Sequence, residues 1–336
     1  MYARRIVSVS RPLASIKTVK IPAAFVQRAL LSNGPIRNDP TPTAPKSSQS
    51  SVDAKKISSL ISDIKASATP KMAQTITPTL SKFTLNDKVA VVTGGARGLG
   101  NSIADALCDV NLKALVIFDV LKQHGDEAVI ELTKKFNIPV VFHQVDVRQK
   151  DSVQAAVDAT VSEFGKIDIL VAAAGIADSN LPAEGYDVEM FRRLIDINLT
   201  GTFVCAQAVG NTMIKANSPG SMIFIASMSG HIVNWPQQQS CYNASKAAVI
   251  MLSKSLAAEW ARYNIRVNSI SPGYMDTALN RVPALDAQKK LWKERTPMNR
   301  LGNVDELNNL AVFMASDAST YMTGTDVIID GGYCTW

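Results

Sequence analysis

The stretch Lys88-Val-Ala-Val-Val-Thr93-Gly-Gly-Ala-Arg-Gly98-Leu-Gly100 decides the fold of this chain. Its first six residues form a short apolar run, which is typical of a buried strand. The glycines that follow permit a tight turn of the backbone. Apolar side chains then recur at helical spacing, at Ile103, Ala104, Leu107 and Val110. A strand, a glycine turn and a helix in this order predict the first unit of an α/β fold.

The same alternation continues to the end of the chain. Apolar runs predict strands at 88–93, 113–118, 139–145, 167–172, 221–226, 265–270 and 326–329. Amphipathic stretches predict helices near 99–110, 122–136, 151–164, 187–216, 241–263 and 303–315. Continuous apolar strands that are joined by helices form a parallel sheet covered on both faces. We therefore predict a Rossmann-type, doubly wound parallel sheet in a single domain, residues 83–336.

The glycine turn has the composition of an anion site. Glycines let the backbone approach a phosphate, and the free amides and dipole of the following helix attract its charge. A turn alone also explains glycines, so the motif needs a second signal. Asp119 supplies it, because this residue ends the run Leu115-Val-Ile-Phe-Asp119 about twenty residues on, where a carboxylate can bind an adenosine ribose. The pair predicts dinucleotide binding.

A second group of polar residues has the composition of an acid–base site. Tyr242 and Lys246 lie four residues apart, and Ser227 lies fifteen residues before the tyrosine. On a helix this spacing places the phenol and the ammonium on one face. A nearby cation lowers the pKa of a phenol from its usual value of about 10. We expect Lys246 to lower the pKa of Tyr242 and make it a general acid or base. A buried tyrosine beside a surface lysine, with Ser227 in a local turn, is the alternative.

Together these residues resemble the short-chain dehydrogenase/reductase family over about residues 83–336. The resemblance implies a catalytic tetrad of Asn198, Ser227, Tyr242 and Lys246. It also implies a cofactor site made by Thr93, Gly94, Arg97, Gly98, Leu99, Gly100, Asp119, Asp146, Val147, Ala173, Gly175, Tyr242, Lys246, Pro272, Gly273 and Thr277. One segment departs from the family pattern, because Ala172-Ala-Ala-Gly175 stands where Asn-Asn-Ala-Gly is usual. The missing amides predict a weaker hydrogen-bond network there.

The cofactor choice depends on Asp119 and Arg97. A carboxylate accepts hydrogen bonds from both ribose hydroxyls of NAD and repels the 2′-phosphate of NADP. A guanidinium in the glycine loop pairs with that phosphate and favours NADP. We expect NAD, with NADP as the alternative.

The substrate prediction rests on the segment between Ser227 and Tyr242. His231, Asn234 and the glutamines 237–239 offer hydrogen bonds for several hydroxyl groups, or they are surface residues of a loop. The segment Ser227-Met-Ser-Gly-His-Ile-Val-Asn-Trp-Pro236 is similar to fungal D-arabinitol 2-dehydrogenases and to the mannitol dehydrogenase/sorbose reductase group. The resemblance implies oxidation of a polyol to a ketose such as ribulose, or the reverse. The alternatives are an NADPH-dependent mannitol/sorbose-type reductase, a mitochondrial 3-ketoacyl-thioester reductase that uses NADPH, and a non-catalytic dinucleotide-binding scaffold.

The first 82 residues differ from the rest. Residues 1–38 hold seven basic residues and no acid, so that the remaining chain carries −1 of the net +6. The predicted domain thus lacks the charge that a nucleic acid partner requires. Residues 1–32 have the composition of a mitochondrial transit peptide, which predicts import into the matrix; without that role the protein would be cytoplasmic. Residues 33–82, rich in Pro and Ser, predict a disordered linker.

Several further expectations follow from composition. The apolar stretches are too short for a membrane span. The four cysteines have no metal-ligand spacing and fit reduced thiols. The helices at 187–216 and 241–263 carry more Ala, Val and Leu than one buried face needs. The family resemblance implies that they pair between subunits in a homotetramer, with Cys334 and Trp336 at another interface; a monomer is the alternative.

Overall fold

The computed structural model describes residues 77–178, 180–281 and 283–336. The predicted transit peptide and nearly all of the predicted linker lie outside these residues. The last residues of the linker form a short helix, α3 (Pro78–Ser81), in which no side chain is buried. Among the described residues, the first fully buried side chain is that of Leu85, close to the predicted start of the domain at residue 83.

Seven parallel strands form one sheet in the order β3-β2-β1-β4-β5-β6-β7. The strands are β1 (Val89–Thr93), β2 (Ala114–Asp119), β3 (Val140–Gln144), β4 (Ile169–Ala172), β5 (Gly220–Ile225), β6 (Ile265–Pro272) and β7 (Asp326–Ile329). The order reverses between β1 and β4, where a doubly wound sheet binds its ligand. The predicted fold class is therefore confirmed.

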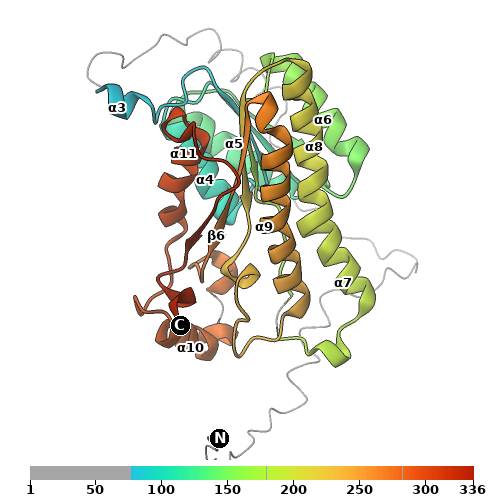
Figure 1. Ribbon diagram of the computed structural model, residues 1–336, viewed down its shortest axis with the longest axis vertical. Coiled ribbons are helices and arrows are strands. Elements are labelled where there is room, and N and C mark those ends of the chain that lie inside the picture. Colours follow the sequence, from blue (N-terminus) through green and yellow to red (C-terminus); the bar gives the residue numbers. More distant parts are fainter. Residues whose placement is uncertain (1–76, 179, 282) are drawn as a thin grey trace, which may run out of the picture. The chain divides into compact units, whose positions relative to one another are not determined.

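Helices cover both faces of the sheet (Figure 1). Three of them, α4 (Gly98–Asp109), α5 (Lys122–Phe136) and α11 (Asn308–Ala315), contribute to one buried cluster. The other cluster contains α6 (Lys150–Phe164), α8 (Gly201–Lys215) and α9 (Ser240–Trp260). In β1, Val89 and Val91 belong to one cluster, and Ala90 and Val92 to the other. Because successive side chains point to opposite faces, a strand between two helical layers must be apolar throughout.

The helix prediction misses two features of the structure. The stretch predicted as one helix at 187–216 is α7 (Val188–Ile195), then a π-helical segment η3 (Asp196–Thr200), then α8. The helix α10 (Asp286–Arg295) was not predicted. Its sequence is strongly polar, and Trp292 is the only buried residue within Asp286–Arg295, so hydrophobic periodicity gives no signal there.

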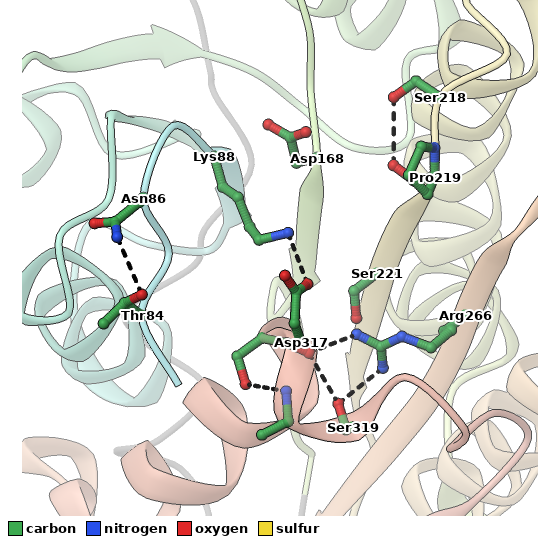
Figure 2. Close-up of polar contacts among 12 residues, drawn as sticks. Thr84, Asn86, Lys88, Asp168, Ser218, Pro219, Ser221, Arg266, Asp317 and Ser319 are labelled. Atoms are coloured by element: carbon green, nitrogen blue, oxygen red, sulfur yellow. Dashed lines mark hydrogen bonds and ion pairs between the residues drawn. The ribbon is translucent and has the colours of Figure 1, made fainter. Parts of the chain in front are cut away.

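The amino ends of the strands are held together by polar contacts, which Figure 2 shows. Arg266 of β6 donates to the Ser319 hydroxyl (3.0 Å) and to the carbonyls of Met314 (2.8 Å) and Ser316 (3.1 Å), where α11 ends. Lys88, just before β1, forms an ion pair with Asp317 at 3.0 Å. This edge therefore anchors the C-terminal region to the sheet. Among the described helices, none combines the length and apolarity that crossing a bilayer demands.

Candidate active site

Five residues predicted for the site lie at the carboxyl ends of successive strands. Thr93 and Asp119 end β1 and β2, whereas Asp146, Gly175 and Ser227 follow β3, β4 and β5. Because all strands are parallel, these ends form one edge of the sheet, opposite the edge that Arg266 holds. Ligands of open α/β sheets bind at this edge.

The glycine loop leaves room for a phosphate group. Gly94 and Gly98 have φ values of +65° and +63°, in the left-handed region that favours glycine. A Cβ atom on Gly98 would meet no atom within 4 Å, whereas a Cβ atom on Gly100 would lie 2.3 Å from the Gly94 carbonyl oxygen. The side chain of Arg97 does not cap α4, and the amides of a first helical turn have no partner within the helix. These features fit the diphosphate of a dinucleotide, with Leu99 in the same first turn.

Asp119 joins the end of β2 to the glycine loop. One carboxylate oxygen accepts a hydrogen bond from the Ala96 amide (3.2 Å), and the other accepts one from the Leu121 amide (3.1 Å). The side chain is buried. Since a carboxylate has about four acceptor positions, this orientation leaves capacity for two ribose hydroxyls.

Asp146 is already paired within the chain. Arg148 donates to both of its carboxylate oxygens, at 2.6 to 3.0 Å, and lowers the pKa of Asp146. Sequence reasoning missed this partner. The side chain of the next residue, Val147, is buried and lies against Gly201 at the start of α8. A Val147 contact with the cofactor would therefore have to come from its backbone.

The Ala172-Ala-Ala-Gly175 segment binds β1 through its backbone. The Ala173 amide donates to the Thr93 carbonyl (3.2 Å), and the Ala174 amide donates to the Thr93 hydroxyl (3.1 Å). A Cβ atom on Gly94 would lie 2.8 Å from Ala174. The chain thus keeps the two loops in close contact without the asparagine amides of the usual family pattern.

Asn198 lies in the π-helical segment, where both the oxygen and the nitrogen of its side-chain amide form hydrogen bonds within the protein. Its oxygen accepts from the Ile176 amide (2.9 Å), and its nitrogen donates to the Ile176 carbonyl (2.9 Å) and to the Ser245 hydroxyl (3.0 Å). A Cβ atom on Gly175 would lie 3.2 Å from the Asn198 amide oxygen and 3.7 Å from the Lys246 Nζ atom. Asn198 and Lys246 therefore lie close together, with glycine the only residue that fits between them without displacement.

Ser227, Tyr242 and Lys246 are brought together as predicted, but one electrostatic prediction is wrong. Burial raises the pKa of the Tyr242 phenol above its usual value, and a hydrogen bond with Ser227 offsets part of this rise. The net shift is therefore upward, although the Lys246 Nζ atom lies 5.7 Å from the centre of the Tyr242 ring and donates to the Ile225 carbonyl (2.8 Å). Burial lowers the pKa of Lys246 to about 8. Desolvation thus favours the neutral form of both groups.

The segment after β6 completes the edge. Pro272 is the last residue of β6, and Gly273 donates to the Ile329 carbonyl (2.8 Å). A Cβ atom on Gly273 would lie 2.6 Å from the Cα atom of Asp330, so this turn contacts the C-terminal Asp330-Gly-Gly332 segment directly. Thr277 follows within the same segment and is half-buried.

The polar residues predicted to bind substrate hydroxyls bond mainly to other parts of the protein. His231 contacts Asp326 (2.8 Å), and Gln237 accepts a hydrogen bond from the Tyr274 hydroxyl. Gln239 donates to Asn234 at 2.9 Å. Sequence reasoning missed Tyr274, which stacks on Trp292 of α10 with ring centres 4.2 Å apart. Within the described residues, no group of three His, Cys, Asp or Glu side chains is arranged to bind a metal ion.

A family described as enoyl-(acyl carrier protein) reductase, of the short-chain alcohol dehydrogenase type, matches residues 94–334. Sorbose reductase sou1 of Schizosaccharomyces pombe is 41% identical over 256 residues, which cover 76% of this chain and 99% of the relative. The chain belongs to the short-chain dehydrogenase/reductase family. As a member of that family it is an NAD(P)-dependent oxidoreductase.

Several further relatives are, by name, enzymes of sugar alcohols. NADP-dependent mannitol dehydrogenase of Hypocrea jecorina is 39% identical, with 79% of this chain and 99% of the relative covered. The ribulose-forming D-arabinitol 2-dehydrogenase of Candida albicans is 38% identical, with 76% and 95% covered. A solved structure of this family, NAD⁺-bound xylitol dehydrogenase, superposes with a TM-score of 0.69 at 32% identity and covers 74% of this chain and 99% of its own.

Proposed function

We propose that this chain is a polyol dehydrogenase that oxidises a secondary alcohol of a sugar polyol with NAD, of the D-arabinitol to ribulose type, or reduces the ketose in the opposite direction. The observation that carries the proposal is the convergence of Asn198, Ser227, Tyr242 and Lys246 at the sheet edge that holds the glycine loop. Similarity to sorbose, mannitol and arabinitol enzymes supports the substrate class.

In this proposal Tyr242 exchanges a proton with the substrate oxygen, while Ser227 donates a hydrogen bond to the same oxygen. Lys246 holds the nicotinamide ribose, and Asn198 fixes the loop that contains Gly175. The dinucleotide, when bound, accepts or supplies the hydride. Because burial raises the pKa of Tyr242, the phenol is protonated near pH 7, which favours its acid role in ketose reduction. We therefore expect the oxidation rate to rise with pH above neutrality.

A steady-state assay at 340 nm with polyols, ketoses and acyl thioesters tests the substrate class. We expect turnover of a five- or six-carbon polyol, and a loss of about 10²- to 10⁴-fold in kcat for Tyr242→Phe. Affinity for the dinucleotide should remain unchanged in that variant. Turnover of acyl thioesters but not polyols would favour the reductase that the family description names. A Tyr242→Phe variant within tenfold of the parent would contradict the role of the tyrosine.

The preference for NAD is proposed from Asp119. Its carboxylate is buried and held by two backbone amides, so it cannot turn away from a 2′-phosphate, whereas the Arg97 side chain is exposed and unfixed by a cap bond. Replacement Asp119→Ser should weaken NAD binding and raise kcat/KM with NADP, measured in parallel assays. If the parent prefers NADP, as the name of the Hypocrea relative states for that enzyme, the interpretation of Asp119 is wrong.

We also propose a homotetramer. Large apolar side chains remain exposed on the helices predicted to pair, namely Val188 and Phe191 of α7, Phe203 of α8 and Met251 of α9. Exposed apolar groups on adjacent elements are typical of a protein interface. Trp336, which the sequence prediction placed at a second interface, is exposed in the single chain.

We propose a mitochondrial location from the composition of residues 1–32 alone. Their arginines, the absence of acids and the serines support import into the matrix. Fusion of residues 1–32 to a fluorescent protein should direct it to mitochondria. A diffuse cytoplasmic signal would contradict the presequence.

A further inference from the structure

Gln239 lies between the two residues that handle the substrate oxygen in the proposed function. It is the last residue before α9, whose first turn contains Tyr242, and it ends the loop that starts after Ser227. Its side chain is buried, with 8% of its surface exposed, although two of its neighbours in the loop, Trp235 and Gln238, are exposed. A buried amide in a largely exposed loop must find its hydrogen bonds within the protein.

The Gln239 amide nitrogen contacts three oxygen atoms, which belong to three separate parts of this region. It lies 2.9 Å from the Asn234 amide oxygen in the middle of the loop, and 2.9 Å from the Asn243 amide oxygen in α9. The third contact, at 3.2 Å, is the Ser229 hydroxyl in the turn after Ser227. We name these four residues, Ser229, Asn234, Gln239 and Asn243, the Gln239 cluster.

Members of the cluster lie within two residues of both catalytic residues in the sequence. The Ser229 amide donates to the Ser227 hydroxyl oxygen (3.1 Å), so the position of Ser229 orients that hydroxyl. At the other end, Asn243 directly follows Tyr242 in α9. Its backbone amide donates to the backbone carbonyl of Gln239 (3.0 Å). Asn234 extends the cluster outward, since its amide nitrogen donates to the Tyr274 hydroxyl (3.3 Å).

The arrangement of hydrogen-bond donors and acceptors around the Gln239 side-chain amide makes this residue difficult to replace. A glutamine nitrogen carries two hydrogens, and two of its three neighbours are amide oxygens, which accept and cannot donate. A glutamate of the same shape would place acceptors against acceptors in a buried position. Rotating the Asn234 amide to donate instead would break its bond to Tyr274. Because buried polar groups without a partner are costly, the loop would have to rearrange.

We propose that Gln239 is a positioning residue: its side-chain amide fixes the distance between Ser227 and Tyr242 by binding both ends and the middle of the loop that separates them. This inference rests on the proposed roles of Ser227 and Tyr242. Displacement of a catalytic group by about 1 Å can lower a rate by about 100-fold. The effect should appear in kcat, because both side chains remain present but are no longer aligned in the transition state.

The chain provides a matched control in the neighbouring glutamine, Gln238, which is exposed and so matches the alternative of a surface residue of the loop. Gln239→Glu and Gln238→Glu introduce the same charge one residue apart. For Gln239→Glu we expect a loss of about 10- to 100-fold in kcat, the size of effect that misplaced catalytic groups produce, with the dissociation constant of NADH unchanged by fluorescence titration. Gln238→Glu should remain within about twofold of the parent, as surface substitutions usually do.

A second variant keeps the test decisive if Gln239→Glu does not fold. Ser229→Ala removes one acceptor and leaves the rest of the cluster, and we expect a smaller loss in kcat from it. If both variants fold, the double variant should lose no more than Gln239→Glu alone, because residues of one network are not additive. Additive losses, an unchanged kcat in both single variants, or equal losses for Gln238→Glu and Gln239→Glu would overturn the inference.

The parallel Tyr242→Phe measurement separates this inference from the proposed function. If Tyr242→Phe is inactive and Gln239→Glu is fully active, the positioning role is wrong and the proposed function stands. If Tyr242→Phe is as active as the parent, the roles of the catalytic residues are wrong, and the inference fails with them.

Discussion

At the scale of one residue, burial of the Lys246 ammonium group lowers the stability of the folded state. Its ammonium is buried, donates to a single carbonyl of the protein, and has a pKa lowered to about 8. An unfolded chain would bind that proton up to its ordinary pKa of about 10.4. Between these two values the unfolded state binds more protons, so stability rises as the pH rises through this window.

We therefore expect Lys246→Met to raise the melting temperature of the ligand-free protein at pH 7 while it abolishes turnover. The gain is at most about 3 kcal/mol, since each pKa unit corresponds to about 1.4 kcal/mol, and the unpaired Ile225 carbonyl reduces it. Thermal unfolding of parent and variant from pH 7 to pH 10 measures the difference, which should shrink above pH 8. A difference that stays constant up to pH 10 would mean that desolvation of the ammonium is not the cause.

At the scale of one element, α4 owes its position to Gly100. A Cβ atom there would lie 2.3 Å from the Gly94 carbonyl oxygen, which belongs to the backbone and cannot rotate away. Gly100→Ala should push α4 from the glycine loop, destabilise the fold by about 1–3 kcal/mol and weaken dinucleotide binding at least tenfold. Titration of NADH fluorescence gives the affinity.

Gly165 provides the control for this prediction. It ends α6 with φ of +84°, and an added Cβ atom would meet nothing within 4 Å. Gly165→Ala should therefore lower stability through backbone strain alone, by about 1 kcal/mol, and leave NADH affinity unchanged. If both variants bind NADH like the parent, the close approach of α4 to the loop is not needed for binding.

The elements that were predicted correctly are those whose burial produces a regular pattern of apolar residues in the sequence. All seven strands were predicted because a strand between two helical layers must be apolar. The glycine turn was predicted because glycine permits a tight turn of the backbone. The π-helical segment that contains Asn198 produces no such pattern, and neither does α10, which buries Trp292 and exposes charges.

The candidate site was predictable only in part for a similar reason. The spacing of Ser227, Tyr242 and Lys246 in the sequence predicts that they lie close together. The pKa values of Tyr242 and Lys246, however, depend on desolvation, which is a property of the folded molecule. The Gln239 cluster depends on side-chain directions within a loop, which no periodicity encodes.

At the scale of the whole molecule, the exposed apolar side chains on α7, α8 and α9 predict assembly. Met251 is 61% exposed near the middle of α9. Met251→Asp should lower the mass measured by light scattering from four subunits to two or one, because a charge in an apolar interface loses its hydration.

Leu80→Asp offers a control, since Leu80 is a comparably exposed apolar residue on α3, outside the helices that are predicted to pair. That variant should keep the mass of the parent. A parent mass near one subunit of 36.2 kDa would exclude the assembly, and an unchanged mass for Met251→Asp would place the interface elsewhere.

The contacts of Arg266 at one end of the sheet affect the thermal stability of the cofactor site at the other end. Arg266 fastens the end of α11 to the sheet, and α11 packs in turn on α4 behind the glycine loop. Heat inactivation that begins by release of α11 would thus open the cofactor site from behind. Substitutions that strengthen the Arg266 edge should lengthen the half-life at elevated temperature without altering turnover.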